Sequence, residues 1–355
     1  MQRHLRTHSF LVLLLAAAWL AGCATAPYPP VKKTETAEPR PNAVLDALAL
    51  DHGLEERILA LDPEHISEHD VRTTLAAGPT PQIVLIHGGI YPVHLAMTSF
   101  AKFLIAMGYP EEKVRHPGDR RYSHSPYENS AQIAGLIAWY YERDGVRPLM
   151  IGHSQGGMQA VKVLHELAGA FADRIPVWDP YTDAAEDRTT IIDPLTGKER
   201  PVVGSSLAYA SAVGAGGAAF LLPNQWSMLH RLRTIPNTVD DFTGFTIGVD
   251  LVAWSLGDSG ANRYRHNGTA HVRNVLLPAQ YNHVTVPVTA YLASDAKLRD
   301  WINGFNPEDP SATVSPPEGT ANILWAAHVW HSIKKHWCLE AQRLIRAKRA
   351  AMAKP

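Results

Sequence analysis

A serine between two glycines offers the clearest chemistry in this chain. Residues 152–156 read Gly-His-Ser-Gln-Gly; the apolar run 149–151 precedes them, and an apolar, helix-forming stretch follows. A G-x-S-x-G turn between a strand and a helix holds its serine in a strained conformation with the hydroxyl exposed. The amides that begin such a helix favour negative charge beside the serine. We therefore expect Ser154 to act as a nucleophile.

The elements that carry this serine alternate between strands and helices. Short apolar runs at 82–86 and 149–151 predict buried strands, and apolar residues spaced by three and four after each run predict helices. Further strands are expected at 206–213, 242–249 and 272–277, helices at 93–107 and from Ser125 onward, and a final helix at 321–350. This alternation predicts an α/β fold, with a mostly parallel sheet covered by helices on both faces.

Two helices carry more detailed predictions. Residues 125–128 read Ser-Pro-Tyr-Glu, which fits a capping box with proline at the first helical position, so we expect a helix to begin there. The final helix has one apolar stripe, which we interpret as core rather than as a binding surface. The stripe consists of Ile323, Ala326, Trp330, Ile333, Trp337 and Leu344.

Over about residues 80–305 the chain resembles the α/β-hydrolase superfamily. The resemblance rests on IVLIHGG at 83–89, on GHSQGG at 152–157 and on the order of the later acidic and histidine residues. It implies an α/β-hydrolase fold with an oxyanion hole made of backbone N–H groups. Carried over to this chain, the donors are Gln155 on one side and Gly89 or Ile90 on the other.

The resemblance also implies a partner acid for the serine. A serine hydroxyl needs an adjacent base, and in this superfamily the chain order is Ser, then Asp or Glu, then His. The acid should follow a strand, and Asp250 comes directly after the run 242–249. Asp240 and Asp241 precede that run, at the wrong end of the strand, and Asp258 lies farther along as a reserve.

The histidine should follow the last strand. His283 lies six residues beyond Leu277, whereas His266 and His271 come before that strand. We therefore expect His283 to take the proton from Ser154 and later to give it to the leaving group, while Asp250 fixes the tautomer of the imidazole. His87 is interpreted as a structural residue of its turn, and His153 as a packing residue.

The N-terminus has the pattern of an export signal. Arg3 and Arg6 precede the apolar run 11–22, and Leu-Ala-Gly-Cys at 20–23 resembles the bacterial lipobox. The resemblance implies a lipid on Cys23 and a place in the bacterial cell envelope; a plain secretory signal is the alternative. The expected organisation is a signal peptide at 1–22, the lipidated cysteine with a proline-rich tether at 23–42, and an α/β-hydrolase domain at 43–355.

A long insertion separates the serine from the acid. The stretch 175–204 is polar and contains proline, and 215–223 is apolar and rich in glycine. Members of the superfamily often insert a cap here, so the resemblance implies a cap within 176–238 that covers the serine. The alternative is a surface loop with one buried strand.

The composition of the chain argues against a nucleic-acid-binding protein, a disulfide-rich protein and a metal site. The chain has 355 residues, of which 46% are hydrophobic, so it can bury a substantial core. Its net charge of −1 indicates no nucleic-acid surface, and two cysteines make no disulfide framework. Three histidines and a cysteine gather in the final helix, at His328, His331, His336 and Cys338. They share no single face and no carboxylate completes the set, so we expect no metal site.

These features predict a lipid-anchored, exported serine hydrolase that cleaves carboxylic esters through an acyl-enzyme on Ser154. We expect no metal and no organic cofactor. The expected partners are a small or lipid-like ester and a membrane reached through Cys23, and no nucleic acid. One alternative is an envelope lipoprotein that uses the fold as a non-catalytic binding module. A serine peptidase, a thioesterase or an acyltransferase are alternatives within the enzymes.

Overall fold

A computed structural model describes residues 44–45, 48–257, 259–308, 317 and 322–353. The expected signal peptide, Cys23, the tether and the reserve acid Asp258 lie outside these residues, so the predictions made for them stay predictions. Within the described residues, no helix combines the length and the apolar character needed to cross a bilayer.

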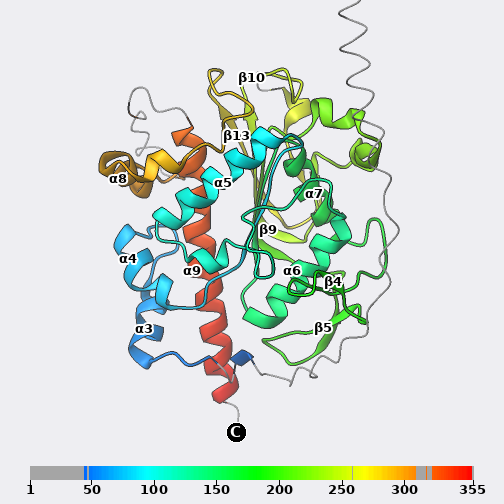
Figure 1. The fold of residues 1–355 in the computed structure, drawn as a ribbon. Coiled ribbons are helices and arrows are strands. Elements are labelled where there is room, and N and C mark those ends of the chain that lie inside the picture. The colour runs from blue at the N-terminus through cyan, green and yellow to red at the C-terminus, as the bar shows by residue number, and fades with distance from the viewer. Residues whose placement is uncertain (1–43, 46–47, 258, 309–316, 318–321, 354–355) are drawn as a thin grey trace, which may run out of the picture.

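Five parallel strands form the central sheet, in the spatial order β1, β2, β7, β9 and β13 (Figure 1). The strands are β1 (Ile83–Ile86), β2 (Leu149–His153), β7 (Leu207–Val213), β9 (Val239–Ile247) and β13 (His271–Leu277). β1, β2 and β7 are buried along their whole length because helices cover both faces of the sheet. The predicted α/β class with a parallel sheet is confirmed.

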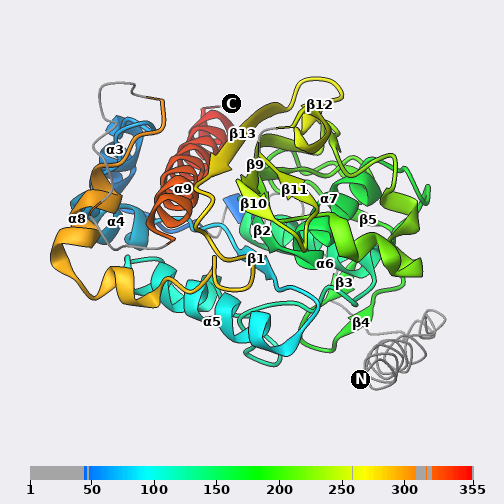
Figure 2. The same cartoon turned by 90° about the horizontal axis from the view of Figure 1, so that it is seen from above.

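Four helices cover the two faces of this sheet (Figure 2). α5 (Tyr91–Ala106) and α9 (Ile323–Met352) pack on one face, in a core that also contains Leu85 and Ile151. α6 (Ser130–Asp144) and α7 (Gln155–Leu167) pack on the other, in a core that contains Val84 and Met150. Successive residues of β1 and β2 thus enter opposite cores, as the pleat of a strand requires.

The final helix is the longest in the described residues, and its predicted stripe lies in the core. All six stripe residues are buried. Three shorter helices lie beside this part of the molecule: α3 (His52–Ala60), α4 (Glu68–Thr73) and α8 (Ala296–Gly304). Of these, α3 and α8 pack directly against α9.

The predicted start of the helix near Ser125 is wrong. α6 begins at Ser130, and Asn129 caps it by accepting a hydrogen bond from the N–H of Ala131 over 2.9 Å. Ser125 and Glu128 do contact each other, since the N–H of Ser125 donates to Oε1 of Glu128 over 2.8 Å. The carbonyl of Glu128, however, accepts from the side chain of Gln159, so the capping-box residues form a turn ahead of the helix.

The long insertion forms two separate parts, one before β7 and one after it. Its first part forms two small hairpins, β3 (Trp178–Asp179) with β4 (Ala184–Ala185) and β5 (Thr190–Ile192) with β6 (Glu199–Pro201). These hairpins pack against α6, away from Ser154. After β7 come the 3-10 helices η3 (Gly217–Leu221) and η4 (Pro223–Met228), of which η4 packs against α7. A cap over the serine therefore stays a prediction for the second part.

The remaining short elements complete the chain. Two more strand pairs are β10 (Val249–Asp250) with β11 (Ser255–Leu256), and β8 (Thr234–Ile235) with β12 (Arg265–His266). The other 3-10 helices are η1 (Leu75–Ala77), η2 (Glu111–Lys113), η5 (Gly260–Asn262) and η6 (Ala290–Ala293). The β10–β11 hairpin matters most here because it carries Asp250 above the ends of β9 and β13 (Figure 1).

Candidate active site

Ser154 lies in a strained turn between β2 and α7. Its backbone has φ 57° and ψ −126°, in a region that side-chain-bearing residues rarely adopt. The N–H of Ser154 donates to the carbonyl of Val213 over 2.8 Å, which ties the turn to the end of β7. The side chain is half-buried and lies at the N-terminus of α7, where the helix dipole favours negative charge.

The two flanking glycines allow this turn to form. A Cβ atom on Gly156 would collide with the carbonyl oxygens of Ile86 and His87 on β1 and the loop after it. A Cβ on Gly152 would collide with the backbone of Gly156 and Gly157. Both glycines are therefore required because β1, β2 and α7 approach one another closely here.

The structure brings together the three residues expected to act in catalysis. Nε2 of His283 lies 2.8 Å from Oγ of Ser154, and Nδ1 of His283 lies 2.6 Å from Oδ2 of Asp250. A carboxylate can only accept, so the Nδ1–H of His283 donates to Asp250. Nε2 then accepts the proton of the Ser154 hydroxyl. This is the geometry that a serine nucleophile requires of its base.

Asp250 is held as a carboxylate. Its burial alone would raise the pKa, but hydrogen bonds from His283 and from the N–H groups of Ala253 and Val252 lower it below the usual value. The two amides donate to Oδ1 over 2.9 and 3.0 Å, which leaves Oδ2 for His283. The hairpin that carries Asp250 therefore fixes both the charge and the direction of the acid.

Two residues that the sequence did not reveal as part of the site lie against His283. His153, taken as packing, donates from Nε2 to the backbone carbonyl of His283 over 2.6 Å. Gly214 (φ 63°) follows β7, and a Cβ there would lie 2.9 Å from Cε1 of His283. A glycine directly after a predicted strand was the available signal for Gly214. For His153 the sequence holds no signal, because its partner is a backbone atom far along the chain.

The loop after β1 faces the serine. A Cβ on Gly88 would lie 3.0 Å from Cβ of Ser154, and the side chain of Gln155 covers Gly89. The hydroxyl of Tyr127 donates to the carbonyl of Gly89 over 3.0 Å, which orients this peptide. Gln155 is the first residue of α7, so its N–H has no partner within the helix. Ile90 caps α5 just beyond this loop and exposes its side chain.

The rejected acids and histidines lie elsewhere. Asp241 and His271 are at the amino ends of β9 and β13, the opposite end of the sheet from Ser154, and they bind each other there. Asp240 pairs with Arg147. His266 lies on β12 and contacts the carbonyl of Gly268.

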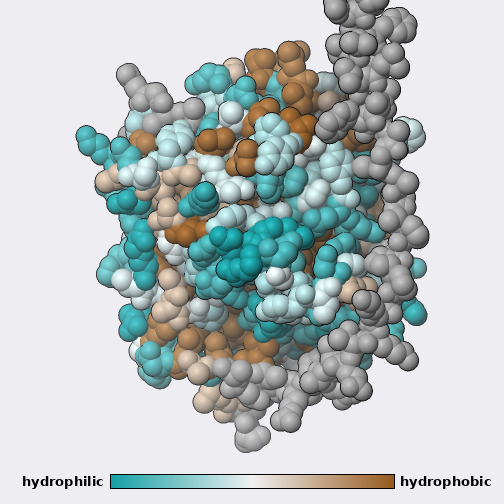
Figure 3. All heavy atoms as spheres, in the orientation of Figure 1, coloured by the Kyte–Doolittle hydropathy of each residue, from teal (hydrophilic) through white to brown (hydrophobic). Residues whose placement is uncertain are grey.

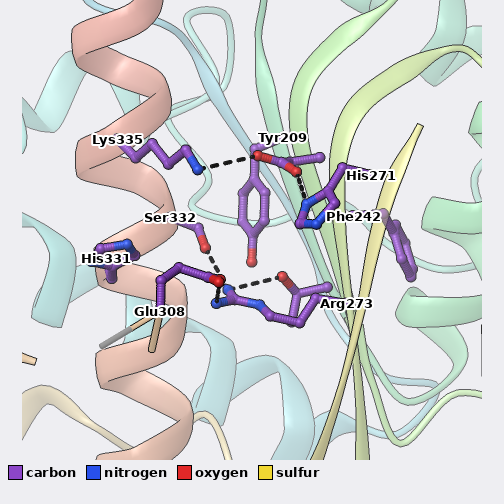
Figure 4. A pocket seen from close by; sticks show the side chains of 10 residues that line it. Tyr209, Phe242, His271, Arg273, Glu308, His331, Ser332 and Lys335 are labelled. Carbon is purple, nitrogen blue, oxygen red and sulfur yellow. Dashed lines mark hydrogen bonds and ion pairs between the residues drawn. The ribbon is translucent and has the colours of Figure 1, made fainter. Parts of the chain in front are cut away.

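The histidines of α9 assemble no metal site. In the part of the chain that the structure describes, no three His, Cys, Asp or Glu side chains are grouped to hold a metal. His336 donates toward Asp241 instead, over 2.8 Å, and burial lowers the pKa of His328 to about 3. Figure 4 shows His331 and Lys335 of α9 across a polar pocket from His271 and Arg273 of β13.

Comparison with known proteins adds little to this geometry. No family model matches the chain, and a search of curated proteins gives no match. Among solved structures, the chain is similar to the esterase domain of a Rhodothermus marinus protein, at 13% sequence identity and a TM-score of 0.31. That match covers 64% of this chain and 84% of the esterase domain. Ser154, His283 and Asp250 therefore carry the functional assignment of this chain.

Proposed function

We propose that this protein is a serine hydrolase of the α/β-hydrolase type that cleaves carboxylic esters. One observation carries the proposal. The hydroxyl of Ser154, held at the N-terminus of α7, is hydrogen-bonded to an imidazole whose other nitrogen is hydrogen-bonded to a buried carboxylate. This combination activates a hydroxyl that is otherwise a poor nucleophile.

In the proposed reaction, Oγ of Ser154 attacks the ester carbonyl carbon while Nε2 of His283 takes the hydroxyl proton. The imidazolium that forms is stabilised by Asp250, and the tetrahedral intermediate collapses when His283 gives the proton to the leaving alkoxide. An acyl-enzyme on Ser154 remains. A water molecule, deprotonated by His283, then attacks the acyl carbonyl carbon. The bond between that carbon and Oγ of Ser154 breaks, His283 returns the proton to Oγ, and the acid leaves.

The developing oxyanion needs hydrogen-bond donors that are already in place. The N–H of Gln155 is one proposed donor, because it begins α7 directly beside Ser154. The N–H of Gly89 is the other, because its peptide lies in the loop that packs against the serine and Tyr127 holds its carbonyl. Ile90 is the alternative second donor at the next peptide.

We further propose that the protein is exported and anchored by a lipid on Cys23. This part rests on the N-terminal sequence pattern alone, since residues 1–43 lie outside the described structure. The cap within 176–238 is likewise proposed, and η3 is its link to the site, because the N–H of Ala218 donates to the carbonyl of Val252, in the hairpin that carries Asp250, over 2.8 Å.

Hydrolysis of short p-nitrophenyl esters tests the proposed function. The full chain should release p-nitrophenol, and Ser154→Ala should reduce kcat by about 10⁵-fold or more. Ser227→Ala is the matched control, because Ser227 is an exposed serine of η4 with no base beside its hydroxyl among the described residues. Equal rates for Ser154→Ala and the wild type would contradict the proposal.

A further inference from the structure

A turn ahead of α6 brings the hydroxyl of Tyr127 to the loop beside the serine. This loop, residues 87–90, joins β1 to α5 and contains Gly88 and Gly89. The hydroxyl of Tyr127 donates to the carbonyl of Gly89 over 3.0 Å. Tyr127 belongs to the Ser-Pro-Tyr-Glu sequence at 125–128, which does not start α6. In this fold the sequence has another consequence, which is the placement of the tyrosine.

Hydrogen bonds fix this turn and tie it to α7. The N–H of Ser125 donates to Oε1 of Glu128 over 2.8 Å, and the N–H of Tyr127 donates to Oγ of Ser125 over 3.2 Å. The carbonyl of Glu128 accepts from the side-chain amide of Gln159, in α7, over 2.7 Å. Ser154 lies at the N-terminus of the same helix. The backbone that carries Tyr127 is therefore held to the helix that carries the nucleophile.

The loop 87–90 needs support from other elements because its two glycines allow many backbone conformations. In the described part of the chain, the N–H groups of Gly89 and Ile90 donate to no protein acceptor. Both groups stay available for a substrate oxygen, but neither holds the loop in place. For Gly88 and Gly89, the restraint comes from hydrogen bonds to their carbonyl groups.

Side chains bind the carbonyl groups of both glycines. Tyr127 binds the carbonyl of Gly89, and the Nδ1–H of His87 donates to the carbonyl of Gly88 over 2.7 Å. The C=O and the N–H of a trans peptide point to opposite sides of the chain. The first hydrogen bond therefore fixes the direction of the N–H of Ile90, and the second fixes that of Gly89. These are the two N–H groups proposed as oxyanion donors in this loop.

We propose that Tyr127 is a positioning residue of the oxyanion hole, an assignment that rests on the proposed function. Its hydroxyl keeps the peptide between Gly89 and Ile90 from turning over. A turned peptide would place the carbonyl oxygen of Gly89 where the N–H of Ile90 now points, and it would change the backbone angles of Gly89. The reaction would then lose donors for the negative charge that develops on the substrate oxygen. Tyr127 acts through the loop 87–90 and not by touching the substrate.

The exposure of Tyr127 separates this role from a structural one. The residue is 47% exposed, so its hydroxyl is not part of the core. A single hydrogen bond of this kind makes a small net contribution to folding. Removal of the hydroxyl should therefore slow the reaction while the urea midpoint of unfolding stays nearly unchanged.

Steady-state hydrolysis of p-nitrophenyl acetate by the full chain tests the assignment. This uncharged ester suits the site, because Figure 3 shows apolar side chains gathered at the top of the molecule, where Figure 1 places β10, the strand of Asp250. Tyr127→Phe removes only the hydroxyl, and kcat should fall about tenfold while KM stays within about twofold. An unchanged kcat would overturn the proposal.

Tyr181→Phe is the matched control. Tyr181 is 62% exposed, and its hydroxyl accepts a hydrogen bond from Arg143 of α6 over 3.4 Å, in the turn between β3 and β4. The control should keep the wild-type kcat, and both variants should keep the wild-type urea midpoint. A Tyr127→Phe protein that loses stability and activity together, with a changed KM, would show a structural role instead.

A second ester shows whether the loss arises at the oxyanion. In p-nitrophenyl thionoacetate a sulfur replaces the carbonyl oxygen, and sulfur is a weak hydrogen-bond acceptor. Hydrolysis of this ester therefore depends less on the oxyanion hole. Tyr127→Phe should lower kcat/KM about tenfold on the oxygen ester and less than about twofold on the thiono ester. Equal losses on the two esters would overturn the proposal, because they would place the defect at Ser154 or His283.

Failure of the proposed function gives a different result. A folded wild-type protein that hydrolyses neither ester contradicts the serine-hydrolase proposal itself, and the assignment of Tyr127 falls with it. A wild-type protein that is active, together with an equally active Tyr127→Phe, contradicts the assignment of Tyr127 alone.

Discussion

His153 donates a hydrogen bond from Nε2 to the backbone carbonyl of His283 over 2.6 Å, so the residue before the nucleophile holds the loop that carries the base. Burial, together with the neighbouring His283, lowers the pKa of His153 to about 3. The imidazole is therefore neutral at every pH at which the enzyme would act. Two histidines with different roles thus lie side by side, with ring centroids 5.3 Å apart.

Replacing His153 should therefore impair the base without removing it. His153→Phe keeps an aromatic ring but loses the bond to the His283 carbonyl, and kcat should fall about tenfold to a hundredfold with little change in KM. The pH profile of kcat/KM should shift as well, because His283 no longer holds a fixed position. His165→Phe is the control, since His165 is a buried histidine of α7 that binds backbone carbonyls away from the site. Unchanged kcat and pH profile in His153→Phe would show that His153 only packs.

Asp250→Asn should lower kcat by about 10³- to 10⁴-fold. An amide at this position can donate to Nδ1 of His283 and so favours the wrong tautomer, which can no longer accept the proton of Ser154. Asp241→Asn offers a matched control, because Asp241 also contacts histidines but at the far end of the sheet. Steady-state kinetics on p-nitrophenyl acetate would show the contrast, and equal losses in the two variants would count against the assigned role of Asp250.

Gly156→Ala should destabilise the turn that holds the serine. The added Cβ meets the carbonyl oxygens of Ile86 and His87, so strand and helix must separate, which costs about 2 kcal/mol in the free energy of unfolding. Gly304→Ala serves as the comparison, because at Gly304 a Cβ meets open space. Urea unfolding of both variants measures the difference. A Gly156→Ala protein as stable and as active as the wild type would refute the close approach of β1 and α7.

Buried neutral histidines should make the fold sensitive to mild acid. Burial lowers the pKa of His328 to about 3, so the unfolded chain, with its ordinary histidine pKa, takes up the proton first as pH falls. Stability from this residue is complete above pH of about 6.5 and is lost progressively toward pH 3. Between pH 7 and pH 5, one such histidine costs about 2 kcal/mol of unfolding free energy.

His328→Phe should remove the contribution of His328 to the pH dependence of the unfolding free energy. The ring lies against Phe245 and Phe305, so phenylalanine fits the same contacts. Urea unfolding at pH 7 and pH 5 should show a smaller loss of stability in the variant than in the wild type. His266→Gln, which replaces an exposed histidine, should keep the wild-type difference. If His328→Phe also keeps it, the imidazole of His328 is charged in the folded state.

The elements that position the site were predictable because their signals are local. The strands before Ser154 and before Asp250 are short apolar runs, and burial on both faces of a parallel sheet requires such runs. The predicted helix start at Ser125 is wrong because tertiary contacts engage Glu128. Its carboxylate binds His124, and its backbone carbonyl accepts from the side chain of Gln159. A capping pattern describes local hydrogen bonds and cannot show that other elements compete for the same groups.

The supports of the site could not be predicted in the same way. Gly214 and His153 act on His283 across long stretches of sequence, so their role depends on how β2, β7 and the last loop come together. The small hairpins at 178–201 cover α6 rather than the serine, because Trp178 and Ile191 complete a core there. Composition showed an insertion but not the surface on which it would pack.

Covalent labelling by a fluorophosphonate tests whether Ser154 is an activated nucleophile. The probe reacts with a serine only when a neighbouring base activates its hydroxyl. The full chain should be labelled at Ser154, as located by peptide mass spectrometry, and Ser154→Ala and His283→Ala should lose the label while Ser227→Ala keeps it. A folded wild-type protein that takes up no label, or one labelled equally when His283 is replaced, would contradict the activation of Ser154 by His283.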